Sequence, residues 1–259
     1  MNRSFALKSY FRYLRKARHR EGFGIHSPFV FRLLNAVFYE KMIYYCYGPI
    51  EDLRGQLEQV DERVKLTDYG TGGYPVRSVA DIAKRSVKRS KYAQLLFRLA
   101  NFNCSQNILE LGTCLGLTTL YLSAVNSQAK LVTIEGDEAL CRLASGNFKR
   151  MRASNIDLRC GAIDDILPAV LTDFNRLDFV FFDANHTLKA TLLYFEACLP
   201  KVHKDTIFVF DDIYRSQEME QAWKTIRNHP KICLSIDIFE MGIVFFNTDL
   251  IKQSYIVAF

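Results

Sequence analysis

From residue 107 onward, short apolar runs alternate with longer segments whose apolar positions recur at helical spacing. The runs predict strands at 107–111, 131–135, 156–160, 178–182 and 206–210. The longer segments predict helices at 117–126, 137–151, 164–172, 187–199 and 216–228. Such alternation is typical of a parallel sheet with helices on both faces. Two further apolar runs, 232–239 and 243–246, flank a short turn with Gly242 and predict a hairpin whose last strand is antiparallel. We therefore expect an α/β fold with a Rossmann-like, seven-stranded, mostly parallel sheet.

The first 85 residues have a different pattern. Residues 1–60 are rich in Tyr and Phe and predict mainly helices, with Ser27 as an N-cap and Pro28 at a first helical position. A glycine-rich loop at 68–75 is either a lid or a plain linker, and a helix is predicted over 78–101. We expect a helical extension over 1–85 and the main domain over 86–259. His26 is interpreted as structural, with a place in a substrate pocket as the alternative.

Composition narrows the class of protein. The 259 residues are 49% hydrophobic, enough for one large α/β domain and an extension. No apolar run reaches about 18 residues, so no membrane span is predicted. The seven cysteines are scattered and form no C-x-x-C pair, which predicts reduced thiols in the cytoplasm rather than a disulfide framework or a zinc site.

The net charge of +6 is concentrated at the N-terminus. Residues 1–20 carry seven Lys and Arg and no acid, which leaves a net charge of −1 for the rest and argues against a broad nucleic-acid groove. Phe5, Leu7, Phe11 and Leu14 recur there at helical spacing. The segment can lie on an anionic membrane or touch nucleic acid. The interpretation we favour is a helix that docks its apolar side on its own protein.

A glycine turn follows the first predicted strand of the main domain. Glu110, Gly112 and Gly116 stand between that strand and a helix, an order that makes a nucleotide-sized pocket. Cys114 occupies the place of the second glycine of a dinucleotide fingerprint, where its Cβ crowds a pyrophosphate. Glu110 favours an ammonium or sulfonium group instead. Glu135 ends the next strand and can bind the two hydroxyls of a ribose, so the pattern predicts an adenosine-containing cofactor.

The turn resembles the E-x-G-x-x-x-G motif of class I S-adenosylmethionine-dependent methyltransferases. The resemblance implies S-adenosylmethionine as the cofactor, held by Glu110, Gly112, Thr113, Gly116, Glu135, Gly136, Ala162 and Asp183. An ordinary strand-turn-helix with incidental glycines is the alternative.

Two later strands end in acids. Asp183 follows one, and Asp211 and Asp212 follow the next, so that neighbouring strand ends would bring the three carboxylates together. They repel one another unless a proton or a cation intervenes, and oxygen ligands suit Mg²⁺ or Ca²⁺. The alternative is that these acids contact solvent, cofactor or a helix N-terminus without a metal.

Residues 90–246 also resemble the catechol-type, cation-dependent O-methyltransferases, through Ile134-Glu135-Gly136-Asp137, Phe-x-Asp183-Ala and the Asp211-Asp212 pair. The resemblance implies a metal ion, such as Mg²⁺, at Asp183, Asp211 and Asp212. The family's catalytic Lys is His186 here, a residue that can act as general base. Asp212 in place of Asn and Ala162 in place of Asp are further departures, and Asp164 can compensate for the second. The whole chain also resembles uncharacterised bacterial methyltransferase-like proteins.

The expected function is methyl transfer from S-adenosylmethionine to a small-molecule acceptor, at oxygen, with Asp183 and His186 beside the acceptor. Tyr214 and Trp223 can stack on a planar substrate, although the mid-helix position of Trp223 favours the core. A non-catalytic S-adenosylmethionine-binding module and a nicotinamide-dependent oxidoreductase are the alternatives. No nucleic-acid substrate is expected, because no N-P-P-Y or D-P-P-Y sequence follows the fourth strand. A homodimer is compatible with the sequence.

Overall fold

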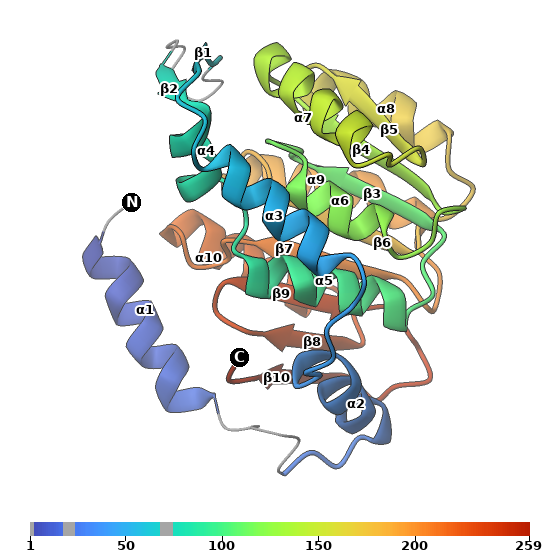
Figure 1. The fold of residues 1–259 in the computed structure, drawn as a ribbon. Coiled ribbons are helices and arrows are strands. Elements are labelled where there is room, and N and C mark those ends of the chain that lie inside the picture. The colour runs from blue at the N-terminus through green and yellow to red at the C-terminus, as the bar shows by residue number, and fades with distance from the viewer. Residues whose placement is uncertain (1–2, 18–23, 68–74) are drawn as a thin grey trace. The chain divides into compact units, whose positions relative to one another are not determined.

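The computed structural model describes residues 3–17, 24–67 and 75–259. The chain forms two compact units (Figure 1). One consists of residues 41–173, and the other combines residues 1–40 with 174–259. The predicted boundary at residue 85 stays a prediction. The glycine-rich segment 68–74 lies outside the described residues, so the structure does not bear on its role.

The unit of residues 41–173 contains three parallel strands in the order β3-β4-β5. They are β3 (Asn107–Leu111), β4 (Lys130–Glu135) and β5 (Ile156–Cys160). The helices α6 (Leu117–Ser123), α7 (Glu138–Arg150) and α8 (Ile163–Thr172) follow these strands in turn. β3 and β4 are buried almost throughout, as expected for strands of a parallel sheet covered on both faces. The predicted strand and helix order of this unit is confirmed.

The N-terminal part of this unit differs from the prediction. The helix expected over 78–101 is two helices, α4 (Val79–Arg85) and α5 (Ser90–Phe102). Ser78 caps α4, since its hydroxyl accepts a hydrogen bond from the Asp81 backbone at 3.1 Å. A two-stranded hairpin of β1 (Arg63–Lys65) and β2 (Val76–Ser78) precedes α4. Both strands have three residues, too few to show an alternating apolar pattern.

Helix α3 (Tyr47–Leu57) supplies part of the core of this unit. The Tyr47 ring meets the rings of Phe97 and Tyr121 edge to face, with centroids 5.7 and 5.6 Å apart. The Tyr121 hydroxyl donates to Glu51 of α3 at 2.9 Å. Residues before position 86 thus share one hydrophobic core with α5 and α6.

The second unit contains five strands in the order β10-β8-β9-β7-β6. They are β6 (Phe179–Phe182), β7 (Ile207–Asp211), β8 (Leu234–Asp237), β9 (Met241–Phe245) and β10 (Gln253–Ile256). β9 runs antiparallel to β7 and β8, so the predicted hairpin is confirmed. β10 pairs parallel with β8 and was not predicted, which makes eight strands across these two strand sets where seven were expected. β10 has only four residues, and two of them are the polar Gln253 and Ser254. It therefore lacks the apolar run from which a strand is predicted.

Helices α9 (Leu188–Cys198) and α10 (Gln217–Asn228) and the 3₁₀ turn η3 (Leu199–Lys201) belong to the same unit. Trp223 of α10 is 1% exposed, so its predicted place in the core is confirmed. A Cβ at Gly242 of β9 would lie 2.6 Å from the Trp223 ring. Glycine at this position therefore lets the strand pass directly over the indole.

The same unit includes α1 (Arg3–Lys16), α2 (Pro28–Leu33) and the π-helix η2 (Leu34–Phe38). Ser27 caps α2 with Pro28 at the first helical position, as predicted. Ser9 and Tyr13 are the buried side chains of α1, whereas Leu7, Phe11 and Leu14 are exposed. The expectation that the apolar side of this helix docks on its own protein is therefore wrong for these three residues. The side chains of α1 that are buried against the unit are instead those of Ser9 and Tyr13, which both carry a hydroxyl group.

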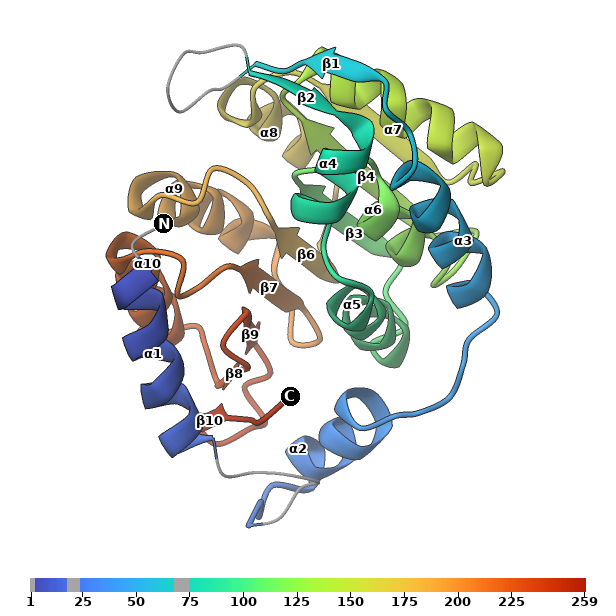
Figure 2. The same cartoon turned by 60° about the vertical axis from the view of Figure 1, so that its left-hand side comes forward.

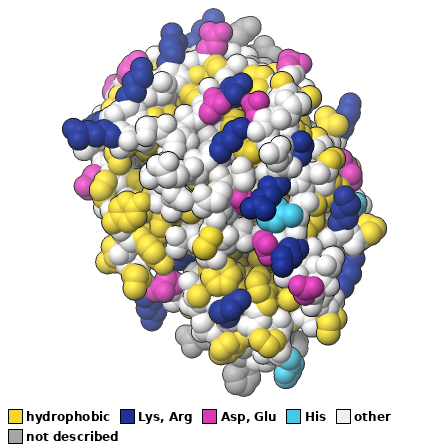
Figure 3. Space-filling view, turned by 90° about the vertical axis from the view of Figure 1, so that its right-hand side faces the viewer, with side chains coloured by type: hydrophobic (Ala, Val, Ile, Leu, Met, Phe, Trp, Pro, Cys, Tyr) yellow, Lys and Arg dark blue, Asp and Glu magenta, His cyan; other side chains and the backbone are white. Residues whose placement is uncertain are grey.

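None of the helices in the described part of the chain is long and apolar enough to span a membrane. Figure 3 shows the face on the right of Figure 1, where Lys and Arg are scattered among acidic and apolar side chains. No single continuous basic patch is visible on that face, in keeping with the near-neutral body of the chain.

Candidate cofactor and acceptor sites

The turn after β3 has the backbone conformation that its glycines predict. Gly112 and Gly116 have φ angles of 99° and 79°, and Cys114 between them has φ 52°. A Cβ at Gly116 would lie 2.4 Å from the Phe148 ring of α7. The Gly112 N–H donates to the Ile134 carbonyl of β4 at 2.9 Å. The glycines therefore serve a tight, left-handed turn and close packing of α6 against α7.

Glu110 lies beneath this turn rather than at its surface. Its side chain is fully buried, and the hydroxyls of Thr119 and Thr133 donate to its Oε2 at 2.5 and 2.7 Å. Burial is the main cause that raises the pKa of Glu110 to about 7, and the two hydroxyls oppose that shift. Within the described residues its Oε1 has no hydrogen-bond partner. A donor that reached this oxygen would relieve the cost of burying it.

Glu135 at the end of β4 holds the turn. Its Oε2 accepts a hydrogen bond from the Cys114 N–H at 2.8 Å, and its Oε1 accepts one from the Asp137 N–H at 3.0 Å. Burial raises the pKa of Glu135 against these backbone hydrogen bonds. A carboxylate oxygen accepts more than one hydrogen bond, so both oxygens keep capacity for hydroxyl donors. Thr113 is tied to the same strand through a 2.6 Å contact between its hydroxyl and that of Thr133.

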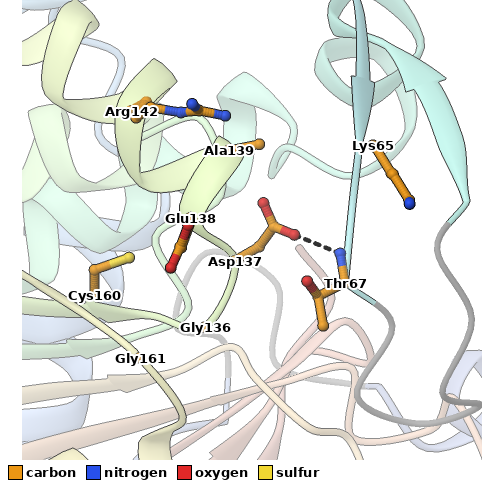
Figure 4. A pocket seen from close by; sticks show the side chains of 9 residues that line it. All are labelled: Lys65, Thr67, Gly136, Asp137, Glu138, Ala139, Arg142, Cys160 and Gly161. Atoms are coloured by element: carbon orange, nitrogen blue, oxygen red, sulfur yellow. Dashed lines mark hydrogen bonds between the residues drawn. The ribbon is translucent and has the colours of Figure 1, made fainter.

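A pocket of about 460 Å³ lies beside Glu135 (Figure 4). The turns after β4 and β5 line it together with the end of β1, through Lys65, Thr67, Gly136, Asp137, Glu138, Ala139, Arg142, Cys160 and Gly161. Asp137 caps α7 by accepting from the Leu140 N–H at 2.9 Å, and it also accepts from the Thr67 N–H. Figure 4 shows this second bond joining the β4–α7 turn to the end of the β1 segment. The Gly161 N–H donates to the Glu135 carbonyl at 2.8 Å, which places Ala162, the N-cap of α8, next to the same strand end.

The structure corrects the prediction that all cysteines are free thiols. Cys141 in the first part of α7 and Cys160 at the end of β5 form a disulfide, with Cα atoms 6.1 Å apart. Parallel pairing of β4 and β5 places Glu135 opposite Cys160, and α7 begins three residues after Glu135. The two cysteines meet through this tertiary pairing, although they are 19 positions apart in the sequence and no motif marks them. The thiols of the other five cysteines, Cys46, Cys104, Cys114, Cys198 and Cys233, are not in disulfides.

In the other unit, three of the predicted residues come together after β6 and β7. Asp183, His186 and Asp211 each offer a ligand atom, and these atoms lie within 4.8 Å of one another. The His186 Nε2 lies 3.6 Å from Asp183 Oδ1. Asp211 is 2% exposed, whereas Asp183 and His186 are partly exposed. Two carboxylates and an imidazole suit a divalent transition metal better than the oxygen-only set expected from the sequence.

Asp212 lies beside this group and pairs with Arg215. Its Oδ2 lies 3.1 Å from the Arg215 Nη1 and 3.9 Å from the His186 Nε2. Its φ of 52° turns the backbone after β7. The geometry thus puts His186, rather than Asp212, with Asp183 and Asp211, and the metal assignment itself stays a prediction.

Tyr214 and Trp223 are occupied by contacts within the unit. Both donate to Asp237 Oδ2, at 2.6 Å from the Tyr214 hydroxyl and 3.3 Å from the indole nitrogen. The Tyr214 ring stacks on Phe239 with centroids 5.4 Å apart. Burial raises the pKa of Asp237, and burial beside Asp237 raises that of Tyr214. The two rings therefore build a buried hydrogen-bonded network around Asp237.

Sequence reasoning missed Thr67, Asp137 and Cys160 as pocket residues. Asp137 carried a signal, since an Asp at the start of a predicted helix is a common N-cap. Thr67 and Cys160 reach the pocket only through the hairpin and the strand pairing, which no local pattern encodes.

Comparison with known proteins finds similarity to methyltransferases. Residues 109–213 match the family model described as a methyltransferase domain. The matched residues run from β3 to the turn after β7 and include both the glycine turn and the Asp211-Asp212 pair.

A curated relative is the catechol O-methyltransferase of Niastella koreensis, 31% identical over 133 residues. The match covers 50% of this chain and 58% of the relative, so the chain spans less than two thirds of that protein.

Solved methyltransferases share the fold. An O-methyltransferase from Bacillus cereus in complex with SAH superposes with a TM-score of 0.57 at 17% identity, over 82% of this chain and 94% of that one. An SAH-bound methyltransferase from Podospora anserina gives 0.59 at 12% identity, over 95% and 97% of the two chains. The predicted α/β fold class is therefore confirmed.

Proposed function

We propose that the protein is an S-adenosylmethionine-dependent methyltransferase that acts on an oxygen of a small-molecule acceptor. The observation that carries the proposal is the turn from Glu110 to Gly116, locked to the carboxylate of Glu135 beside a pocket. The methyltransferase family match over 109–213 and the SAH-bound relatives support it. The sequence of the turn favours a sulfonium cofactor over a dinucleotide because Cys114 has a Cβ where a pyrophosphate would approach.

The residues fit such a cofactor. Glu135 keeps acceptor capacity for the two ribose hydroxyls, and the pocket at Gly136 and Gly161 has room for a base. Glu110 Oε1 is a buried acceptor without a partner among the described residues, which suits the ammonium group of the methionine portion. Gly112, Thr113, Gly116 and Ala162 contribute backbone groups at the same strand ends.

The residues after β6 and β7 are assigned to the acceptor. Methyl transfer is an in-line displacement in which the acceptor oxygen forms a bond to the methyl carbon while the carbon–sulfur bond breaks and sulfur keeps the electron pair. The hydroxyl proton passes to His186 Nε2, and Asp183 at 3.6 Å stabilises the imidazolium that forms. This part of the chain therefore supplies proton acceptance, and the cofactor supplies the electrophile.

A divalent cation fits the same group of donors. Asp183, His186 and Asp211 would hold it, and a bound cation lowers the pKa of a hydroxyl that it coordinates. Coordination through Nε2 would replace proton acceptance by His186, because one nitrogen lone pair cannot serve both. Direct measurement of metal binding distinguishes the two arrangements.

The test is calorimetric titration of the purified protein with S-adenosylhomocysteine, with NADH as the comparison ligand. We expect binding of S-adenosylhomocysteine alone, weakened at least about tenfold by Glu135→Gln, since a lost hydrogen bond to a charged group costs about 1.5–3 kcal/mol. The matched control is Asp165→Asn, which removes an exposed carboxylate outside the pocket. Binding of NADH in place of S-adenosylhomocysteine would overturn the proposal in favour of an oxidoreductase.

Transfer of a radiolabelled methyl group to a panel of small hydroxylated acceptors then tests turnover. Label transfer that His186→Ala abolishes supports the proposed role of His186. Tight cofactor binding without transfer to any acceptor would favour a non-catalytic binding module.

A further inference from the structure

Helix α1 presents an apolar ridge to solvent. Leu7, Phe11 and Leu14 are 57, 63 and 46% exposed, and Tyr10 is 42% exposed although its ring packs on the Phe239 ring, with centroids 5.0 Å apart. Their spacing of three, four and seven residues from Leu7 puts them on one face of the helix. Single exposed apolar residues are common on protein surfaces, but four on consecutive turns of one helix form a continuous strip that marks an interaction site.

The other face of α1 is fastened within its own unit. The Tyr13 hydroxyl donates to the Val257 carbonyl at 2.6 Å, and Ser9 and Tyr13 are buried. Arg12 forms an ion pair with Glu220 of α10 at 2.9 Å. Figures 1 and 2 both show α1 beside β10 and α10, the elements that carry or adjoin these partners. These contacts fix which face of the helix packs on its unit, so the ridge on the opposite face points to solvent.

Basic side chains border the ridge. Lys8 and Arg15 are exposed and lie on the same flank of the helix, one position along from Leu7 and Leu14. Lys16 is also exposed, and residues 1–20 contain seven Lys and Arg and no acid. A partner of this surface must accept apolar side chains and supply negative charge next to them.

We propose that α1 docks the protein on an anionic lipid surface. The ridge would enter the boundary between headgroups and acyl chains, and the flanking cations would contact lipid phosphates. A second copy of the chain fits less well, because a symmetric contact through α1 would bring the same cations face to face. Nucleic acid would match the charge but would leave Leu7, Phe11 and Leu14 without apolar surroundings.

The test is co-flotation of the full chain with vesicles of phosphatidylcholine containing about one third phosphatidylglycerol. We expect binding that falls at least about tenfold on pure phosphatidylcholine vesicles or in high salt, since each basic residue near an anionic surface contributes several-fold and salt screens it. Phe11→Ser should weaken binding to the anionic vesicles by a similar factor. Ile251→Ser removes an apolar side chain that is 81% exposed elsewhere in the same unit and should leave binding unchanged.

A second variant keeps the proposal testable if Phe11→Ser is poorly folded by circular dichroism. Phe11→Trp places an indole on the ridge, while Trp223 stays buried as a constant background. Insertion should shift the Phe11→Trp emission to shorter wavelength on anionic vesicles only. The proposal is overturned if the protein does not float with anionic vesicles, or floats equally after Phe11→Ser and Arg15→Gln. Dimerisation lost in Phe11→Ser, or binding of duplex DNA or RNA without vesicle binding, would overturn it in favour of those partners.

Discussion

The Cys114 N–H donates to Glu135 Oε2 across 2.8 Å, so a residue of the glycine turn is held by the acid that ends the neighbouring strand. The other oxygen of Glu135 accepts from Asp137, which caps α7. One carboxylate thus positions the turn after β3 and the turn after β4 together. Both turns are therefore held in place by hydrogen bonds within the protein itself.

Glu135→Gln should lower stability as well as cofactor affinity. The amide can accept one of the two backbone hydrogen bonds, but its NH₂ group faces the second donor and leaves it unsatisfied. We expect a loss of about 1–3 kcal/mol in the free energy of unfolding, measured by urea denaturation. Asp165→Asn is the control, and an unchanged midpoint for Glu135→Gln would show that the carboxylate does not hold the turns.

Glu110 should make the stability of the protein depend on pH. Its folded pKa of about 7, raised by burial, exceeds the ordinary value of 4.5, so the folded state retains a proton that the unfolded state loses. Stability contributed by this group is full below about pH 4.5 and is lost as the pH rises through about 7, with an expected size on the order of 1–3 kcal/mol.

Glu110→Gln should remove this decrease, because the amide does not ionise. Urea denaturation of both proteins between pH 5 and 8 measures the difference. Parallel pH profiles for the wild type and the variant would contradict the assigned pKa.

Gly116→Ala tests the left-handed turn. A side chain at φ 79° is strained, and the added Cβ would lie 2.4 Å from Phe148. We expect destabilisation of about 2 kcal/mol or more, together with loss of S-adenosylhomocysteine binding. Gly146→Ala is a matched control in α7, where nothing lies within 4 Å of the new Cβ, and it should be neutral or slightly stabilising. Equal effects at both glycines would refute the role of the turn.

The group of Asp183, His186 and Asp211 predicts a metal preference. An imidazole among the donors should favour Mn²⁺ over Mg²⁺. Electron paramagnetic resonance of free Mn²⁺ during titration measures binding directly, and His186→Ala should weaken it about tenfold or more. Asp205→Asn, which changes an exposed carboxylate of the same unit, is the control. Absence of Mn²⁺ binding would leave proton acceptance as the role of His186.

Reduction of the Cys141–Cys160 disulfide should destabilise the protein. Opening a loop of this length removes about 2–4 kcal/mol of stabilisation. Thiol titration of the unfolded, unreduced chain should find five reactive cysteines, and seven after reduction, because five of the seven cysteines are not in a disulfide. Cys141→Ser should abolish the effect of the reductant on stability, whereas Cys104→Ser should preserve it. Seven reactive thiols without reduction would exclude the disulfide.

Local pattern predicted the strands from β3 to β9 because each is an apolar run bounded by turns or helices. β10 and the β1–β2 hairpin escaped, since three or four mixed residues show no periodicity and form strands only through pairing with distant segments. The glycine turn and Glu135 are close in sequence and were recognisable. The Cys141–Cys160 bond, the contact of Thr67 with Asp137 and the outward ridge of α1 depend on tertiary packing, which a local pattern does not encode.

The hydrogen bond from Tyr13 to Val257 has a consequence for folding during synthesis on the ribosome. Tyr13 of helix α1 leaves the ribosome before its partner Val257, which is synthesised 244 residues later. At about 5–20 residues per second, this delay is on the order of 10–50 s. Until Glu220 and then Val257 are synthesised, the nascent helix lacks these two partners, and its apolar and basic side chains are available to chaperones or to any nearby anionic surface.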